Sequence, residues 1–155
     1  GKSLGSTLSN SVTAVSKLQG QSTSCPNSIA QYAAIEALVG DQKCIKIMRE
    51  KFLKRRNLIL SLIRDIPNTL CKTPNGAFYI FVDFSYYLSA LTLKGHEIKD
   101  SVDLCSYILE TTGVVTVPGD SFGAPGHIRF SYATSEETIT KAIKRVHETL
   151  LNLTF

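Results

Sequence analysis

Arg129 is the residue of this 155-residue sequence whose type and position most directly suggest chemistry. It lies in the segment 127–133, HIRFSYA, where strand alternation places it on one face with His127 and Ser131 and the apolar residues on the other. The planar guanidinium suits bidentate pairing with a carboxylate, a charge-assisted contact worth about 1.5–3 kcal/mol. An exposed strand arginine or a structural ion pair is the alternative, and the local sequence alone favours that alternative.

A basic cluster on a predicted helix is the second candidate, because lysine and arginine side chains can bind phosphate. The other face of that helix is apolar and includes Phe52, Ile59 and Ile63. This arrangement favours a solvated helix face over a nucleic-acid contact. The cluster consists of Lys51, Lys54, Arg55 and Arg56.

The loop 118–126 contains three glycines but neither of the common phosphate-binding glycine motifs, and it does not lead into a helix. A nucleotide site is therefore not expected. Ser121, Ser131 and His127 could suggest a nucleophilic serine, but no G-x-S-x-G segment is present and the sequence places no acid beside the histidine. The residues argue against serine catalysis here.

Carboxylate pairs in the helices are expected to be structural, because acidic side chains favour helix N-termini and solvent. These pairs are Asp103 with Glu110 and Glu136 with Glu137. The histidines and cysteines do not follow a zinc-site spacing, so no metal is expected. We expect buried free thiols rather than disulfides. The cysteines are Cys25, Cys44, Cys71 and Cys105, and the histidines are His96, His127 and His147.

Composition indicates one globular domain able to hold a core without disulfides or metals, with 43% hydrophobic residues, 19% charged residues and a net charge of +4. This mild basicity is weak for a nucleic-acid binder. No apolar run is long enough for a membrane span, and the first twenty residues lack a signal-peptide layout. A cytoplasmic protein with no membrane contact is predicted.

The elements that position Arg129 form a predicted α+β domain, a small sheet covered by helices. Before residue 24 no element is expected. Asn75-Gly76 predicts a tight hairpin, because these residues tolerate positive φ. Expected helices are 26–40 with Ser24 as cap, 41–66, one from Asp100 to Gly113 and one capped by Thr134, and expected strands are 69–72, 77–83, 114–117 and 127–132.

Four segments, in order, resemble the C-terminal portion of class I aminotransferases, and most closely the bacterial-type aspartate aminotransferases of subgroup Ib. They are 17–31 (KLQGQSTSCPNSIAQ), 76–79 (GAFY), 115–123 (VTVPGDSFG) and 128–137 (IRFSYATSEE). The resemblance implies the small C-terminal domain of the fold-type I aminotransferases, with a mostly antiparallel sheet preceded by a long interdomain helix. It also implies that residues 1–25 belong to the large-domain and interface segment and residues 26–155 to the small domain.

By this resemblance the protein is a pyridoxal 5′-phosphate enzyme of amino-acid metabolism, a homodimer that transfers an amino group from L-aspartate to 2-oxoglutarate. Aromatic or prephenate-type substrates are the alternatives. Arg129 occupies the place of the arginine that holds the substrate α-carboxylate, and this reverses the preference stated above. Phe78 is implied to lie beside that carboxylate, or else to be a core aromatic. The segment 22–26 is implied to lie at the dimer interface, where Cys25 replaces the commoner asparagine.

The family's cofactor-binding lysine lies in a Ser-x-Ser-Lys segment upstream of the matched region, and this sequence lacks that segment. By the resemblance, Lys17 matches the helix beyond the active-site segment, and it is not assigned as the Schiff-base lysine. We therefore expect no catalytic, cofactor or metal residue on this chain, which would be an inactive fragment of a longer enzyme. The alternative is a non-catalytic module that recognises amino-acid carboxylates or a protein partner.

Overall fold

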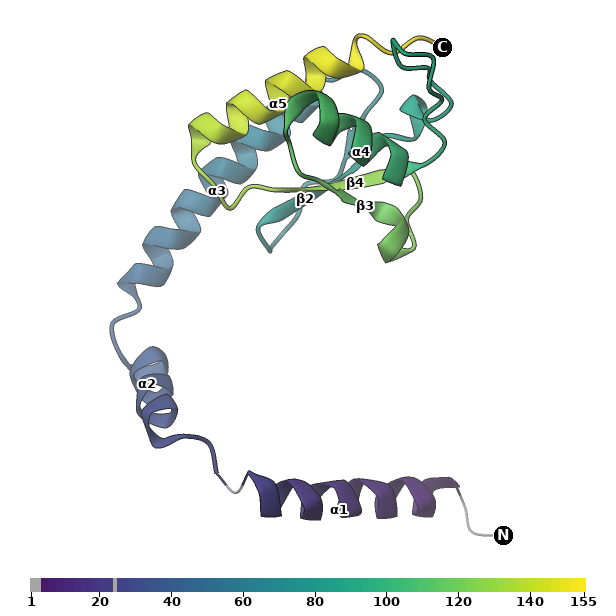
Figure 1. The fold of residues 1–155 in the computed structure, drawn as a ribbon. Coiled ribbons are helices and arrows are strands. Elements are labelled where there is room, and N and C mark those ends of the chain that lie inside the picture. Colours follow the sequence, from purple (N-terminus) through teal and green to yellow (C-terminus); the bar gives the residue numbers. More distant parts are fainter. Residues whose placement is uncertain (1–3, 24) are drawn as a thin grey trace. The chain divides into compact units, whose positions relative to one another are not determined.

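The computed structural model describes residues 4–23 and 25–155, which form two compact units, Gly1–Ile45 and Lys46–Phe155. The elements are shown in Figure 1. In chain order they are α1 (Leu4–Ser22), α2 (Ser28–Val39), α3 (Lys43–Arg64), β1 (Leu70–Cys71), β2 (Tyr79–Asp83), η1 (Ser85–Tyr87), α4 (Ser101–Thr112), β3 (Val117–Pro118), η2 (Gly119–Phe122), β4 (His127–Ser131) and α5 (Glu136–Leu150).

The first unit contains α1 and α2, and its described side chains are almost all exposed. The apolar pattern did not predict the helix α1, because its polar sequence has little apolar periodicity, but the family resemblance implied a helix at Lys17, which α1 contains. The predicted helix that ends at Gly40 is confirmed as α2, but its N-cap is Asn27, whose side chain accepts a hydrogen bond from the Ile29 N–H at 2.8 Å. The predicted cap, Ser24, lies outside the described residues.

The second unit confirms the predicted α+β fold: an antiparallel sheet in the order β1-β2-β4-β3, with α3, α4 and α5 on one side of it (Figure 1). The central pair is β2 and β4, whose register joins Phe81 to Arg129. The edge strand β3 is shorter than predicted. It pairs with β4 only at Val117 and Pro118, and proline has no N–H with which to extend the ladder.

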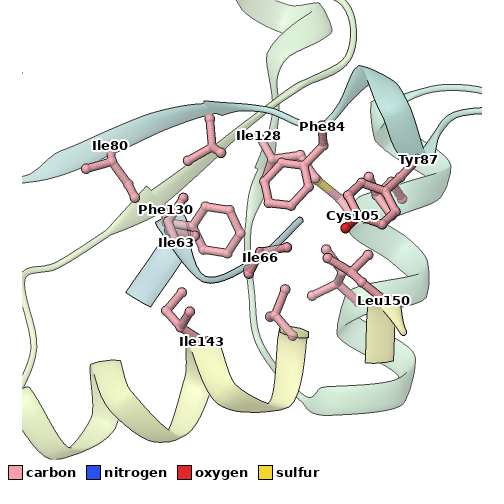
Figure 2. Close-up of a cluster of buried hydrophobic side chains, with 14 of the residues drawn as sticks. Ile63, Ile66, Ile80, Phe84, Tyr87, Cys105, Ile128, Phe130, Ile143 and Leu150 are labelled. Atoms are coloured by element: carbon pink, nitrogen blue, oxygen red, sulfur yellow. The ribbon is translucent and has the colours of Figure 1, made fainter. Parts of the chain in front are cut away.

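The core lies between the sheet and these helices (Figure 2). Alternation along the two central strands directs Ile80 and Val82 of β2, and Ile128 and Phe130 of β4, to this face, where all are buried. The helices contribute the apolar residues Ile59, Ile63, Leu104, Ile108, Ile139, Ile143, Val146 and Leu150. None of these helices packs on the opposite face of the sheet. That face carries the polar and aromatic residues of β2 and β4.

Local capping confirms one predicted helix boundary and corrects another. Asp100 caps α4 by accepting hydrogen bonds from the N–H groups of Val102 and Asp103, both at 2.9 Å, and Gly113 ends it with φ 70°. The predicted cap of the last helix was one residue early. Ser135, not Thr134, accepts the hydrogen bond from the Thr138 N–H at 3.1 Å.

The predicted hairpin between β1 and β2 is present, but the connection is a wide loop rather than a tight Asn-Gly turn. The residue with positive φ is Ala77, at 63°, and neither Asn75 nor Gly76 adopts it. Two contacts from outside the loop determine this geometry: the Arg56 guanidinium donates to the Pro74 carbonyl, and the Tyr132 hydroxyl donates to the Ala77 carbonyl, each at 3.0 Å.

No helix among the described residues is long and apolar enough to cross a membrane. All four cysteines are free thiols. The predicted burial is correct for Cys105 and wrong for Cys25 and Cys44, which are exposed, while Cys71 is half-buried.

Candidate functional site

Arg129 lies at the centre of the open sheet face, as the strand alternation predicted. It is half-buried, and its neighbours in register are Phe81 on β2 and Val117 on β3. Its guanidinium carbon lies 5.1 Å from the ring centroid of Tyr79 and 5.0 Å from that of Phe122. Both distances are within the range of a cation–π contact.

Within residues 4–23 and 25–155, Arg129 makes neither an ion pair nor a side-chain hydrogen bond. The structural ion pair considered as its alternative role is therefore not formed in the part of the chain that the structure describes. A half-buried guanidinium with free N–H donors is a binding group for an anion, and its forked geometry favours a carboxylate.

The loop 118–126 contributes Phe122 to this site through the short helical turn η2. Gly123, with φ 68°, ends η2, and Gly126, with φ 76°, leads into β4. Two of the loop amides are used internally: the N–H groups of Gly123 and Ala124 donate to the carbonyls of Asp120 and Gly119. The specific backbone angles expected of this loop are present, and they direct Phe122 over Arg129.

A cavity of about 690 Å³ opens on the same sheet face beside Arg129. Its lining includes Tyr79, which also faces the guanidinium, together with Phe81, Asp83, His127, Cys71 and Lys72. The His127 ring stacks on Phe81 with centroids 5.0 Å apart. The cavity is therefore a mixed aromatic and polar space next to the candidate anion-binding group.

Asp83 is the acid that the sequence did not place near His127; the two are opposite each other in the β2–β4 register. The Asp83 carboxylate accepts a hydrogen bond from the Ser85 N–H at 2.9 Å. Hydrogen bonding by Ser85, through its hydroxyl and its backbone N–H, lowers the pKa of Asp83, and His127 acts in the same direction. His127 Nδ1 lies 3.2 Å from the Pro125 carbonyl, and no described serine hydroxyl bonds to the ring, so the arrangement is not a nucleophilic triad.

Phe78 is not one of the two rings that the Arg129 guanidinium lies over. Its ring packs edge-on against Tyr79 with centroids 5.9 Å apart, and it is half exposed at 53%. It lines a second cavity, of about 370 Å³, with Phe52, Tyr132 and Arg56. Phe78 is therefore not a core residue of the described chain, and it adjoins the Arg129 site through the Tyr79 ring.

The other sequence candidates have structural contacts. Lys54 pairs with Glu136 at 3.0 Å, Lys141 pairs with Glu137 at 2.6 Å, and Asp103 accepts a hydrogen bond from the Lys99 N–H. In the basic cluster Arg55 lies over the Phe52 ring and Arg56 binds the Pro74 carbonyl, while Lys51 is exposed. Of the interface segment, Cys25 is exposed and Ser24 lies outside the described residues.

Tyr79 and Phe122 are the residues of this site that sequence reasoning missed. Alternation along β2 could have assigned Tyr79 and Phe81 to the polar face, because Ile80 and Val82 are the core residues. The approach of Phe122 could not be inferred from local pattern, since it depends on the path of η2.

Comparison with known proteins gives consistent matches along the chain. The family model for aminotransferase class I and II matches residues 2–146. The chain is 40% identical to an aspartate aminotransferase of Rhizobium meliloti over 135 residues, which are 87% of this chain and 33% of the relative. It is 41% identical to an aspartate/prephenate aminotransferase of Cereibacter sphaeroides, again over 87% of this chain and 34% of the relative.

A solved structure shares the fold: the aspartate aminotransferase from Rhizobium meliloti superposes with a TM-score of 0.85 at 38% identity, over 92% of this chain and 36% of that one. The chain thus spans about a third of the length of the relatives it matches.

Proposed function

This chain belongs to the class I and II aminotransferase family, and we propose that it supplies the part of an aminotransferase that binds the substrate α-carboxylate, with Arg129 as the binding residue. The observation that carries the proposal is the half-buried Arg129 guanidinium, which faces Tyr79 and Phe122 and has no acidic partner among the described residues. A bidentate contact there would fix the orientation of the substrate Cα, and such orientation lowers the barrier to reaction.

The proposed amino donor is L-aspartate and the proposed acceptor is 2-oxoglutarate. The names of the relatives, aspartate aminotransferase and aspartate/prephenate aminotransferase, support a substrate range in which the α-carboxylate is constant and the rest of the molecule varies. Arg129 would serve every such substrate, because each one carries this group.

Pyridoxal 5′-phosphate is the proposed cofactor, and it would supply the electron sink for amino-group transfer. The described residues of this chain do not themselves fit a site for it. Lys72 is the lysine that lines the cavity beside Arg129, but it is exposed, whereas a Schiff-base lysine is activated by burial or by a neighbouring cation. In the loop 118–126 the N–H groups of Gly123 and Ala124 bond within the loop, so these two donors are not available to a phosphate. We therefore propose that residues outside this sequence hold the cofactor.

We further propose that residues 1–25 belong to an interface segment, in a cytoplasmic homodimer whose small domain is residues 26–155. The helix α2, which belongs with residues 1–25 to the compact unit Gly1–Ile45, supports an interface role for this end of the chain. A helix that is apolar on all sides is normally buried in a larger assembly, and the large apolar side chains of α2 are 55–81% exposed. These side chains are Ile29, Tyr32, Ile35, Leu38 and Val39.

The test is substitution of Arg129 in the enzyme that contains this chain. Loss of one charge-assisted hydrogen bond corresponds to about a tenfold to 150-fold loss of kcat/KM, so Arg129→Ala should lower kcat/KM at least this much. Aspartate and a neutral amino acid should be affected alike. Arg64→Ala, an exposed arginine at the end of α3, is the matched control and should change neither value.

Unchanged kcat/KM for Arg129→Ala would refute the proposal. A loss confined to aspartate would also refute it, because Arg129 would then bind the side-chain carboxylate instead of the α-carboxylate.

A further inference from the structure

We propose that Tyr79 and Phe122 are positioning residues for Arg129, whose rings hold the guanidinium by cation–π contacts and leave its N–H groups available to a carboxylate. This inference rests on the proposed function of Arg129. It goes further by assigning a role to two residues that contact the binding group itself.

The two rings approach Arg129 from the two segments that flank β4. Tyr79 lies on β2, one step along the sheet face from Phe81, the residue opposite Arg129, and such diagonal neighbours are within reach of an aromatic side chain. Phe122 ends η2, the turn that follows β3 on the other side of β4. The guanidinium carbon is almost equidistant from the two ring centroids, at 5.1 and 5.0 Å.

Further aromatic contacts hold these rings in place. Phe122 meets Phe81 edge-on with centroids 6.1 Å apart, and Phe81 stacks on His127. On the other side Tyr79 meets Phe78 edge-on. Although Phe122 is 53% exposed and Tyr79 is 38% exposed, each ring therefore has an aromatic neighbour in addition to Arg129.

Aromatic rings and an acidic side chain differ in what they leave available on a neighbouring arginine. A carboxylate partner would neutralise the charge and occupy the N–H fork that a substrate needs. An aromatic ring attracts the cation through its face and takes no N–H donor. Tyr79 and Phe122 can therefore restrict Arg129 while its full charge and its donors remain available.

The placement of the Arg129 guanidinium against the two rings can be tested on the 155-residue chain by following the Arg129 Nε–Hε signal in an ¹H–¹⁵N spectrum. Protons over an aromatic face resonate upfield, so Tyr79→Leu and Phe122→Leu should each shift this proton downfield. The ring-retaining variants Tyr79→Phe and Phe122→Tyr should keep it near the wild-type position. Tyr86→Leu removes an exposed ring that packs on Phe155, 4.8 Å between centroids, and is the matched control.

Function can be tested in the enzyme that contains this chain. Loss of one cation–π contact at a partly exposed site corresponds to about a twofold to fivefold loss of kcat/KM. We expect this loss to appear as a higher KM for both the amino acid and the 2-oxo acid. The value of kcat should be nearly unchanged, because the contact acts equally on bound substrate and transition state. A merely structural role would reduce the active fraction, lowering kcat and leaving KM unchanged.

The outcomes separate this inference from the proposed function. If Arg129→Ala lowers kcat/KM but both leucine variants keep wild-type KM and an unshifted Nε–Hε signal, the positioning role is wrong and the function stands. If Arg129→Ala has no effect, the proposed function fails, whatever the rings do to the Nε–Hε signal. Failure of Tyr79→Phe and Phe122→Tyr to restore KM would also overturn the positioning role.

Discussion

Substituting Gly119 by alanine should test whether the loop before β4 can accommodate a Cβ atom at this position. Gly119 is buried at the start of η2, and an added Cβ would clash with the backbone oxygens of Ala124 and His127. Backbone atoms cannot rotate away as a side chain can. The loop itself would have to move, and Phe122, three residues further on, would move with it.

This clash should lower the free energy of unfolding. Overpacking a well-packed site costs about 1–3 kcal/mol, and a clash with two backbone oxygens belongs in the upper half of that range. For a cooperative unit of about 110 residues, Lys46–Phe155, 1 kcal/mol corresponds to about 4 °C in melting temperature. Gly119→Ala should therefore lower the melting temperature by about 8–12 °C.

The measurement is thermal unfolding followed by circular dichroism, with Gly123→Asn as the control from the same loop. Gly123 has positive φ but no atom within 4 Å of an added Cβ, and asparagine tolerates this backbone region, so the control should cost less than about 1 kcal/mol. A melting temperature of Gly119→Ala within about 1 °C of wild type would refute the reasoning. A larger loss for Gly123→Asn than for Gly119→Ala would do so too.

Two further predictions concern stability. Because Ser85 lowers the pKa of Asp83 below its ordinary value of about 3.9, the associated stability is present above about pH 4 and is lost as the pH falls through the lower folded-state pKa. Asp83→Asn should therefore flatten part of the acid-side fall in melting temperature, and identical pH profiles for variant and wild type would contradict this. Asp100→Ala removes the acceptor for two N–H groups of α4 and should lower the free energy of unfolding in urea by about 1 kcal/mol, while Asp100→Asn should retain most of it; equal losses would contradict the capping role.

Features decided within a few residues were the ones that the sequence predicted well. Alternation around Arg129 was sufficient to assign its face, and the cap of α4 was correct because Asp100 bonds to two N–H groups only two and three residues further along the chain. The choice between Thr134 and Ser135 was less determined, because both hydroxyl residues can cap a helix and serine is only somewhat preferred.

Features decided by distant contacts were missed. The loop before β2 takes its shape from Arg56 on α3 and Tyr132 after β4, so its Asn-Gly pair was misleading. The aromatic neighbours of Arg129 come from positions about 50 residues before it and 7 residues before it, and only strand register and the η2 turn bring them together. Local sequence patterns therefore do not predict that these two rings contact Arg129.

The placement of Arg129 on a central strand also constrains how the sheet can assemble. Side chains alternate along a strand, so a slip of β4 by one residue against its neighbours would turn Arg129 toward the helices and expose Ile128 and Phe130. A buried guanidinium without a partner is very costly, so this misaligned sheet is strongly disfavoured. The same arginine that would recognise a carboxylate thus also helps to fix the register of β4 against its neighbouring strands. Replacing it by an apolar residue would lower the energetic penalty for pairing β4 in a shifted register during folding.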